Sequence, residues 1–171
     1  MAAGGSGLSL EGLPFGSDLA RREVAYNGPE HAGTVVVRTS QRRLYLVQSG
    51  GRALRYAIGV GREEGLNFRG SAVVGRKEQW PSWTPTANMM RHIPRYRAYA
   101  GGMPGGIDNP LGARALYLYR GGHDTHFRLH GTNDPSTIGQ AVSSGCIRLT
   151  NEDVTDLYSR VPVGAPVVVK P

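Results

Sequence analysis

The chain has 171 residues, which is enough for one ordinary domain and a short leading segment. Hydrophobic residues make up 39% and charged residues 19%, a balance that supports a buried core and excludes wholesale disorder. The single cysteine, Cys146, excludes an intrachain disulfide and a cysteine-cluster metal site. With 20 basic and 13 acidic residues the net charge is +7, which suits nucleic acid, an anionic surface or a carboxylate-bearing substrate.

Membrane and export signals are missing from the sequence as given. No stretch approaches the roughly 20 apolar residues that a membrane-spanning helix needs. Residues 1–13 lack the basic head and apolar run of a signal peptide. We therefore expect a chain that does not span a membrane.

Strand signals begin at residue 33, after a glycine-rich segment. We expect residues 1–32 to form a partly flexible lead segment, with a short helical stretch within 17–26, and residues 33–170 to form one domain. Three β-branched or alternating runs predict strands at 34–37, 43–47 and 54–60. Gly50 and Gly51 can adopt the positive φ angles of a tight hairpin turn between the last two runs. Together these signals indicate a β-meander.

Residues 61–113 are loosely patterned, and so long a loop-rich insert is typical of a functional or mobile segment. Thr84, before Pro85, is placed to cap a short helix that Pro94 would end. The aromatic residues of the insert are expected to pack beneath the loop, as aromatic rings usually do, or to line a substrate groove: Trp80, Trp83, Tyr96 and Tyr99.

Strand character returns at 115–119 and 126–130. An alternating pattern places His126, Arg128 and His130 on one face of the second strand and its apolar residues on the other. We therefore expect His130 at a strand end, facing away from the packed side.

A short turn is predicted at Asp134-Pro135, and one clear helix begins after Thr150. Its apolar stripe follows the spacing of a helix packed on a core: Val154, Leu157, Tyr158 and Val161. A last strand is expected at 167–169. The elements together predict a mostly β fold, a sandwich or barrel-like stack of short strands with this helix packed against it.

Two residues stand out for their chemistry, Cys146 and His130, sixteen positions apart. A free thiol is a poor nucleophile at neutral pH, and a nearby imidazole can take its proton. Gly145 lets a reacting carbonyl approach the backbone, and adjacent N–H groups can hold a developing oxyanion. Arg148 adds a positive charge that can bind a carboxylate or favour the thiolate. The competing interpretation is that Cys146 is a small buried hydrophobe and His130 an ordinary polar residue.

Two other signals are discounted. His123, His126 and His130 resemble a metal-ligand series, but an alternating strand turns His123 to the opposite face from the other two. The glycine-rich stretch 101–106 lacks the Gly-Lys-Ser/Thr ending of a phosphate-binding loop, so we interpret it as a flexible connector.

His130-Gly131-Thr132-Asn133-Asp134 and the later run Ser143-Ser144-Gly145-Cys146-Ile147-Arg148 resemble the active-site block of the L,D-transpeptidase catalytic domain, the YkuD-like family of peptidoglycan cross-linking enzymes. Segments 34–47, 109–112 and 161–167 resemble further parts of that domain, so the likeness extends from about residue 33 to 170. The family fold agrees with the mostly β architecture predicted above.

The resemblance implies a role for each matching position. The nucleophile falls on Cys146 and its base on His130, oriented by the backbone carbonyl of Gly131. The oxyanion donors fall on the amides around Gly145 and Cys146, and Arg148 takes a structural or carboxylate-binding role. Ser143 and Ser144 complete the substrate-binding segment. Many relatives have histidine where this chain has Ser144, so any role of that second histidine is not carried over.

The implied reaction is acyl transfer without a metal or organic cofactor. The thiolate attacks a stem tetrapeptide, D-alanine leaves, and an amine resolves the thioester, in a second stem or in an envelope protein. Peptidoglycan stem peptides are then the partners, nucleic acid is not one, and the substrate class places the protein in the periplasm or cell envelope, in cell-wall biogenesis and cell shape.

Three alternatives stay open on the residues. Water as the acceptor gives an L,D-carboxypeptidase. A non-catalytic peptidoglycan-binding module would keep the fold, and Ser144 and the basic charge are its motivation. Nucleic-acid binding depends on the net charge alone and predicts strongly salt-dependent retention on DNA.

Overall fold

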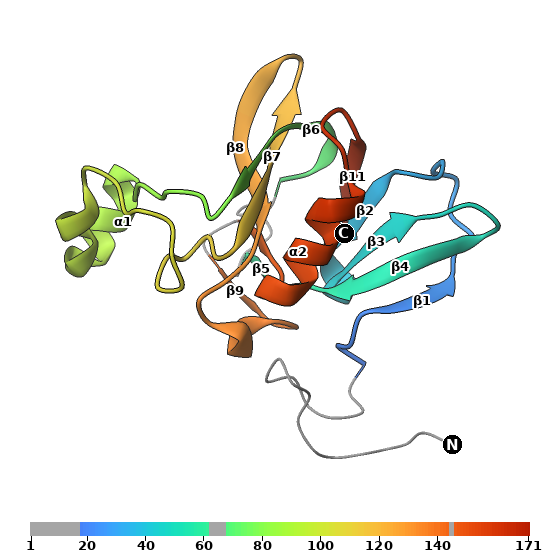
Figure 1. Cartoon of the computed structure of the whole chain (residues 1–171), viewed down its shortest axis with the longest axis horizontal. Coiled ribbons are helices and arrows are strands. Elements are labelled where there is room, and N and C mark those ends of the chain that lie inside the picture. Colours follow the sequence, from blue (N-terminus) through green and yellow to red (C-terminus); the bar gives the residue numbers. More distant parts are fainter. Residues whose placement is uncertain (1–17, 62–67, 144–145) are drawn as a thin grey trace.

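The computed structural model describes residues 18–61, 68–143 and 146–171. Within these ranges the regular structure is mostly β, as predicted (Figure 1). The strands are β1 (Arg22–Ala25), β2 (Val35–Arg38), β3 (Arg43–Val47), β4 (Arg52–Ala57), β5 (Val60–Gly61), β6 (Gly70–Gln79), β7 (Arg114–Arg120), β8 (His123–His130), β9 (Ala141–Ser143), β10 (Ile147–Arg148) and β11 (Pro166–Lys170). The helices are α1 (Ala87–His92) and α2 (Asn151–Arg160), with 3₁₀ turns η1 (Thr39–Gln41), η3 (Pro94–Tyr99) and η4 (Pro135–Thr137).

The described strands form one nine-stranded sheet, in the order β1-β4-β3-β2-β11-β6-β7-β8-β10, and a two-stranded pair of β5 and β9. The last strand, β11, pairs parallel with β2 and antiparallel with β6. It therefore joins the N-terminal meander to the half of the sheet that ends on β8 and β10. None of the helices in the described ranges is long and apolar enough to cross a membrane.

One apolar core lies against this sheet, and α2 lies between the β2–β4 strands and the β6–β8 strands (Figure 1). α2 contributes the buried side chains Val154 and Leu157, from the stripe that its sequence predicts. Thr150 caps the helix by accepting a hydrogen bond from the backbone N–H of Asp153. The N-terminus of α2 is thereby fixed beside the end of β8.

The hairpin turn, the strands in 115–119 and 126–130, the turn after Asp134 and the last strand are confirmed. The predicted meander is also present, but the run 54–60 is divided: β4 ends at Ala57, and Val60 begins β5 in the other sheet. Gly50 and Gly51 have φ angles of 74° and 72°, as the tight turn requires. The described part of β8 is longer than expected, and its alternation is interrupted. His126 has a φ of 67°, and the register with β7 shifts there, so the alternating-face argument holds only from residue 127 to 130.

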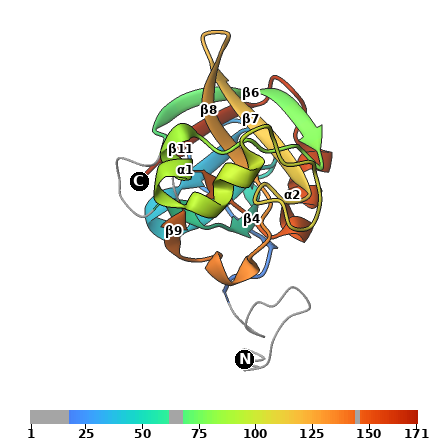
Figure 2. The same cartoon turned by 90° about the vertical axis from the view of Figure 1, so that its left-hand side faces the viewer.

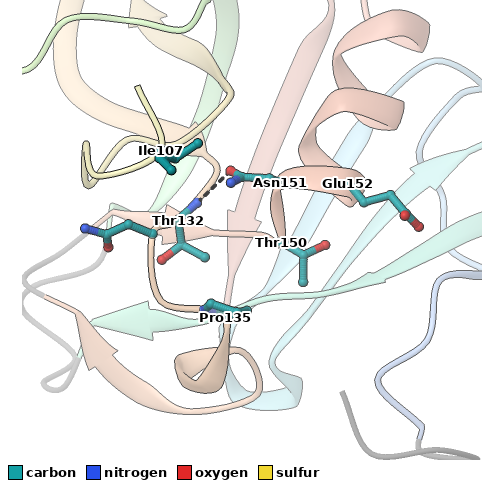
Figure 3. Close-up of a pocket in the computed structure, with 7 residues that line it drawn as sticks. Ile107, Thr132, Pro135, Thr150, Asn151 and Glu152 are labelled. Carbon is teal, nitrogen blue, oxygen red and sulfur yellow. Dashed lines mark hydrogen bonds between the residues drawn. The ribbon is translucent and has the colours of Figure 1, made fainter. Parts of the chain in front are cut away.

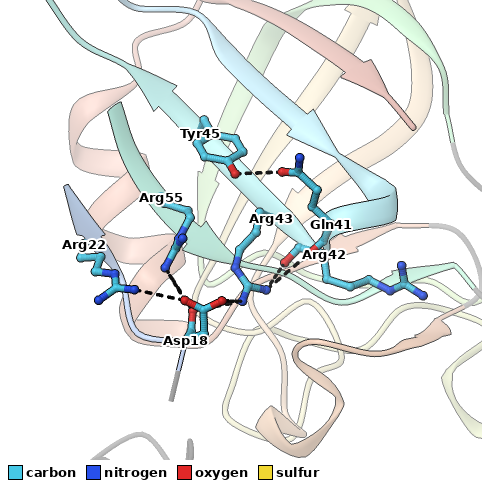
Figure 4. Close-up of polar contacts among 7 residues, drawn as sticks. All are labelled: Asp18, Arg22, Gln41, Arg42, Arg43, Tyr45 and Arg55. Atoms are coloured by element: carbon cyan, nitrogen blue, oxygen red, sulfur yellow. Dashed lines mark hydrogen bonds and ion pairs between the residues drawn. The ribbon is translucent and has the colours of Figure 1, made fainter. Parts of the chain in front are cut away.

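The helical stretch expected within 17–26 is wrong, because residues 22–25 form β1 on the edge of the sheet, paired with β4. The carboxylate of Asp18 forms ion pairs with Arg22, Arg43 and Arg55, two of which come from strands β3 and β4 (Figure 4). Burial raises the pKa of this carboxyl, but the guanidinium groups outweigh it and the pKa is lowered. These tertiary contacts override the local helical signal.

The segment 61–113 is less loop-rich than expected, because it contains the ten-residue strand β6, which the sequence analysis did not predict. Ala72 and Val74 face the core, but Gly75 then introduces a register shift against β7. A side chain at Gly75 would collide with the ring of Tyr119. The glycine and the charged residues that follow conceal the alternation that would have predicted this strand.

Residues 80–108, which we call the insert lobe, leave the sheet between β6 and β7 and carry α1 and η3 (Figure 2). The expected short helix is present, but Thr86 rather than Thr84 caps it. Asn109 is fully buried, and its side-chain amide donates hydrogen bonds to the carbonyls of Pro81 and Pro104 at 3.1 Å each. This amide closes the base of the lobe.

Asp153 should make the stability of the fold depend on pH. Burial raises its pKa to about 6, from an ordinary 3.8, although Arg21 forms an ion pair with it at 2.8 Å. The native state then binds more protons than the unfolded state between about pH 4 and 6, so the stability that this group contributes falls as pH rises through that window. Urea unfolding at several pH values should show this slope, and Asp153→Asn should remove it.

Asp156, one turn further along α2, has a pKa shifted in the opposite direction from that of Asp153. Burial raises its pKa, but hydrogen bonds from Tyr56 and Arg160 outweigh burial and lower it. The stability that Asp156 contributes is lost as pH falls below 3.8, the ordinary pKa of an aspartate. The variant Asp156→Asn should therefore lose less stability on acidification than the wild-type protein. An unchanged slope in Asp153→Asn would contradict the assignment to Asp153.

Candidate active site

The site lies where the parallel strands β8 and β10 meet at the end of the sheet. Ile147 pairs with Leu129 and Arg148 with His130. Leu129 and Ile147 are both buried in the core. Because side chains alternate along a strand, His130 and Arg148 therefore lie on the other face of the sheet. Cys146 immediately precedes β10, and its sulfur accepts a hydrogen bond from the backbone N–H of Arg128.

The register gives a diagonal arrangement of four side chains: Arg128 and His130 on β8, Cys146 and Arg148 on or beside β10. Neighbouring strands lie about 4.8 Å apart and alternate residues about 6.6 Å apart, so the Cβ atoms of Cys146 and His130 are expected roughly 8 Å apart. The lengths of the imidazole and thiol side chains can bridge such a gap. Each of these two residues also has a guanidinium beside it.

His130 is buried, with 5% of its surface exposed. Its Nδ1 lies 2.5 Å from the carbonyl oxygen of Gly131, and a carbonyl can only accept, so Nδ1 carries the hydrogen. The other ring nitrogen, Nε2, then keeps its lone pair. Burial lowers the pKa of His130 to about 4, and the charges of Arg148 and Arg128 act in the same direction against the Gly131 hydrogen bond. The ring is therefore neutral at physiological pH.

Cys146 is partly exposed. Burial of the sulfur raises the pKa of its thiol, while a hydrogen bond from the backbone N–H of Arg128 and the charges of Arg128 and Arg148 oppose this rise. The net direction is upward. In the resting protein the thiol of Cys146 and the imidazole of His130 are therefore both neutral.

Arg148 reaches the site without a carboxylate partner in the described part of the chain. Its Nε is buried and has no hydrogen-bond partner there. Burial lowers the pKa of this guanidinium, while the charges of Asp134, Cys146 and Tyr96 raise it. A buried guanidinium N–H without an acceptor is costly, so this group is suited to an anionic ligand.

Arg128 is the neighbour that sequence reasoning did not select as a site residue. Asp124 holds its guanidinium in a two-pronged ion pair at 2.8 and 3.3 Å, and the group lies 4.5 Å from the centre of the Tyr117 ring. Its alternation with His130 was visible in the sequence. Its approach to Cys146 was not, because β10 is too short to be predicted.

Asn151, the first residue of α2, joins three segments beside the site. Its Oδ1 accepts hydrogen bonds from the backbone N–H groups of Thr132 at 3.2 Å and Ala113 at 3.0 Å. A side chain at Gly131 would collide with this oxygen, so glycine is required there. Thr132 and Asn151 also border a pocket of about 250 Å³ (Figure 3), which is lined by Ile107, Thr132, Asn133, Pro135, Thr150, Asn151 and Glu152.

The remaining predicted positions are described only in part. Ser143 ends strand β9, and nothing is described of its side chain. Ser144 and Gly145 lie outside the described residues, so the expected oxyanion donors around Gly145 stay a prediction. Among the aromatic residues of the insert lobe, Trp83 packs edge-on against Tyr96 with ring centres 5.0 Å apart, while Trp80 and Tyr99 are exposed.

The family model of the L,D-transpeptidase catalytic domain, YkuD, matches residues 32–169, a range that includes β8, β10 and α2. The chain belongs to this family. Probable L,D-transpeptidase YbiS of Escherichia coli K12 is 39% identical over 145 residues, which are 80% of this chain and 44% of YbiS. Probable L,D-transpeptidase ErfK/SrfK of the same strain is 37% identical over 140 residues, or 79% and 43%. The chain thus spans less than half the length of these curated relatives.

Solved structures agree with the fold. A Brucella melitensis protein described as a probable carnitine operon oxidoreductase is 45% identical, with a TM-score of 0.62 over 90% of this chain and 95% of that one. That description names a different reaction from that of the family. L,D-transpeptidase 3 from Mycobacterium tuberculosis has a TM-score of 0.57 at 19% identity, over 81% of this chain and 60% of that one, which is a likeness of fold alone.

Removing the oxygen of Asn151 should loosen the segment that carries His130. Asn151→Ala leaves two buried amide donors without an acceptor, at a cost of about 1–3 kcal/mol each, shared with any water that enters. The expected result is a lower free energy of unfolding and faster amide exchange at Thr132 and Ala113. Asn151→Asp keeps the accepting oxygen and is the matched control, so equal losses in the two variants would contradict this role.

Proposed function

We propose that the chain catalyses peptidoglycan L,D-transpeptidation, with Cys146 as nucleophile and His130 as its base. The observation that carries the proposal is the pairing of β8 with β10, in which Arg148 lies opposite His130 and Cys146 immediately precedes the paired residues, while the Gly131 carbonyl orients the His130 imidazole. The family match adds the reaction class.

The reaction begins with transfer of the Cys146 proton to Nε2 of His130 as Sγ attacks the carbonyl carbon of the L-centre residue in a stem tetrapeptide. The carbonyl oxygen becomes an oxyanion, for which the amides around Gly145 and Cys146 are the expected donors. The C–N bond then breaks, and His130 returns the proton to the departing D-alanine. A thioester at Cys146 remains, and an amine attacks it to form the new amide and release the thiol.

The pKa directions fit proton transfer during attack. A neutral His130 can accept a proton at once, and the Gly131 carbonyl stabilises the charged ring that results. The Arg128 amide and the two guanidinium groups stabilise the sulfur only after it becomes negative. Stabilisation therefore grows toward the transition state, which is the condition for catalysis.

The charges around the site suit a donor with carboxylates and an acceptor with an amine. Arg148, with its buried Nε lacking an acceptor, is placed to bind a carboxylate of the donor stem. Of the acidic residues in the described ranges, only Asp108, Asp134 and Glu152 form no ion pair. All three belong to segments that border the pocket. This favours an ammonium-bearing acceptor, a second stem or a protein amine, over water.

The proposed reaction also implies binding partners and a cellular location. Peptidoglycan stem peptides would be the partners, and the periplasm or cell envelope would be the place of action. Neither a metal nor an organic cofactor enters the steps proposed above.

Covalent capture by a carbapenem tests the nucleophile and the base together. Intact-mass measurement should show one adduct per chain, located on Cys146 by peptide mapping, and Cys146→Ala should show none. His130→Gln should slow adduct formation about 10²- to 10⁴-fold, because the general base is lost. Folding of both variants is checked by circular dichroism. A folded wild-type protein that stays unmodified, or an unaltered rate in His130→Gln, would refute the proposal.

A further inference from the structure

The insert lobe has an unusual charge distribution. Between Glu78 and Asp108 the sequence has no acidic residue, whereas Arg91, Arg95 and Arg97 lie close together on α1 and η3. All three arginines are exposed, and none forms an ion pair with a carboxylate among the described residues. Four exposed arginines elsewhere each pair with an acidic residue: Arg22, Arg52, Arg76 and Arg160. Arg120 is exposed without an ion pair, but its guanidinium donates hydrogen bonds to two backbone carbonyls. The lobe therefore carries three unpaired arginines against a single carboxylate, that of Asp108 at its last residue, and is net positive.

The lobe also exposes large hydrophobic side chains. Trp80, Tyr99 and Ile107 are 44%, 38% and 76% exposed, and they are three of the five large hydrophobic residues that stand out in this way in the described chain. Single exposed hydrophobic residues are ordinary, but their gathering on one lobe together with unpaired arginines is typical of a binding surface.

The lobe approaches Arg148 at one end and borders the pocket at the other. The Tyr96 side chain, in η3, lies close enough to affect the pKa of Arg148. Ile107, at the other end of the lobe, lines the pocket with Thr132 and Asn151 (Figure 3). A molecule bound along the lobe would therefore reach the pocket beside the segment that follows His130.

We propose that the insert lobe is a second binding surface for the polymeric substrate, which holds an anionic neighbouring stretch of peptidoglycan while one stem peptide occupies the site. This inference rests on the proposed function. Arg91, Arg95 and Arg97 pair with carboxylates of adjacent stems, and the exposed rings pack on the apolar faces of the polymer. A second contact on the same polymer raises the effective concentration of stems at Cys146.

A membrane surface is the competing partner, because basic and aromatic residues also bind anionic lipids. Binding to a bilayer needs the apolar residues to point away from the protein body. Here Ile107 lines the pocket, and Tyr96 contacts Trp83 and affects Arg148, so part of the apolar surface faces the pocket and the protein body. This geometry favours a substrate that passes from the lobe into the pocket.

Binding to purified sacculi tests the proposal with the full chain. The variant Arg91→Gln/Arg95→Gln/Arg97→Gln should need roughly tenfold more sacculi for half-maximal co-sedimentation, with the wild-type protein losing affinity steeply as salt rises. The matched control, Arg22→Gln/Arg52→Gln/Arg160→Gln, removes the same charge from exposed, ion-paired positions and should shift binding less than twofold. Circular dichroism and thermal unfolding establish that both variants are folded.

Two outcomes would contradict the assignment to the lobe, and each points to a different explanation. Equal losses in the two variants would show that net charge alone binds the polymer, and would overturn the assignment to the lobe. If the Arg91→Gln/Arg95→Gln/Arg97→Gln variant bound sacculi as well as the wild-type protein but lost binding to vesicles of anionic phospholipid, the lobe would be assigned to a membrane surface instead. Failure of the proposed function is recognised separately, because it would leave wild-type Cys146 unmodified by a carbapenem whatever the sacculus result.

Discussion

The parallel pairing of β8 and β10 is the constraint on which the site depends. This pairing consists of two residue pairs: Leu129 with Ile147 inside the core, and His130 with Arg148 on the other face. A slip of one residue would turn the site residues into the core and the apolar ones outward, so burial of Leu129 and Ile147 fixes the register. The remaining sheet supports this pairing from the β7 side, and Asn151 secures the turn that follows His130. Packing of apolar residues thereby determines where the polar ones meet.

The same burial that orients the site also sets its resting charge. Both the imidazole of His130 and the thiol of Cys146 are driven toward their neutral forms, and the groups that favour a thiolate come from backbone and arginine. A neutral thiol reacts slowly with electrophiles other than the substrate, and it becomes strongly nucleophilic only when its proton can move to the imidazole. Charge is also uneven nearby: α1 and η3 carry three unpaired arginines, whereas the carboxylates of Asp108, Asp134 and Glu152 belong to segments that border the pocket.

Much of this arrangement could be predicted from the sequence, and the gaps have physical causes. Strands such as 43–47 and 115–119 and helix α2 carry strong periodic signals, and the motif around Cys146 identified the family. β1 and β6 were missed because long-range pairing forms the first and Gly75 interrupts the second. Arg128 was not selected as a site residue because only the three-dimensional register brings it beside Cys146. The partners of a two-residue strand such as β10 are determined by tertiary structure, not by local propensity.

The most direct measurement of the central claim is ¹⁵N NMR of the His130 imidazole across pH, in the wild-type protein and after alkylation of Cys146. The account predicts a neutral ring protonated on Nδ1 down to about pH 5, since burial places the pKa near 4, and a clear shift of the Nε2 signal when the sulfur is alkylated. A ring that titrates near its ordinary value of 6.5, or an Nε2 signal indifferent to alkylation, would contradict the account.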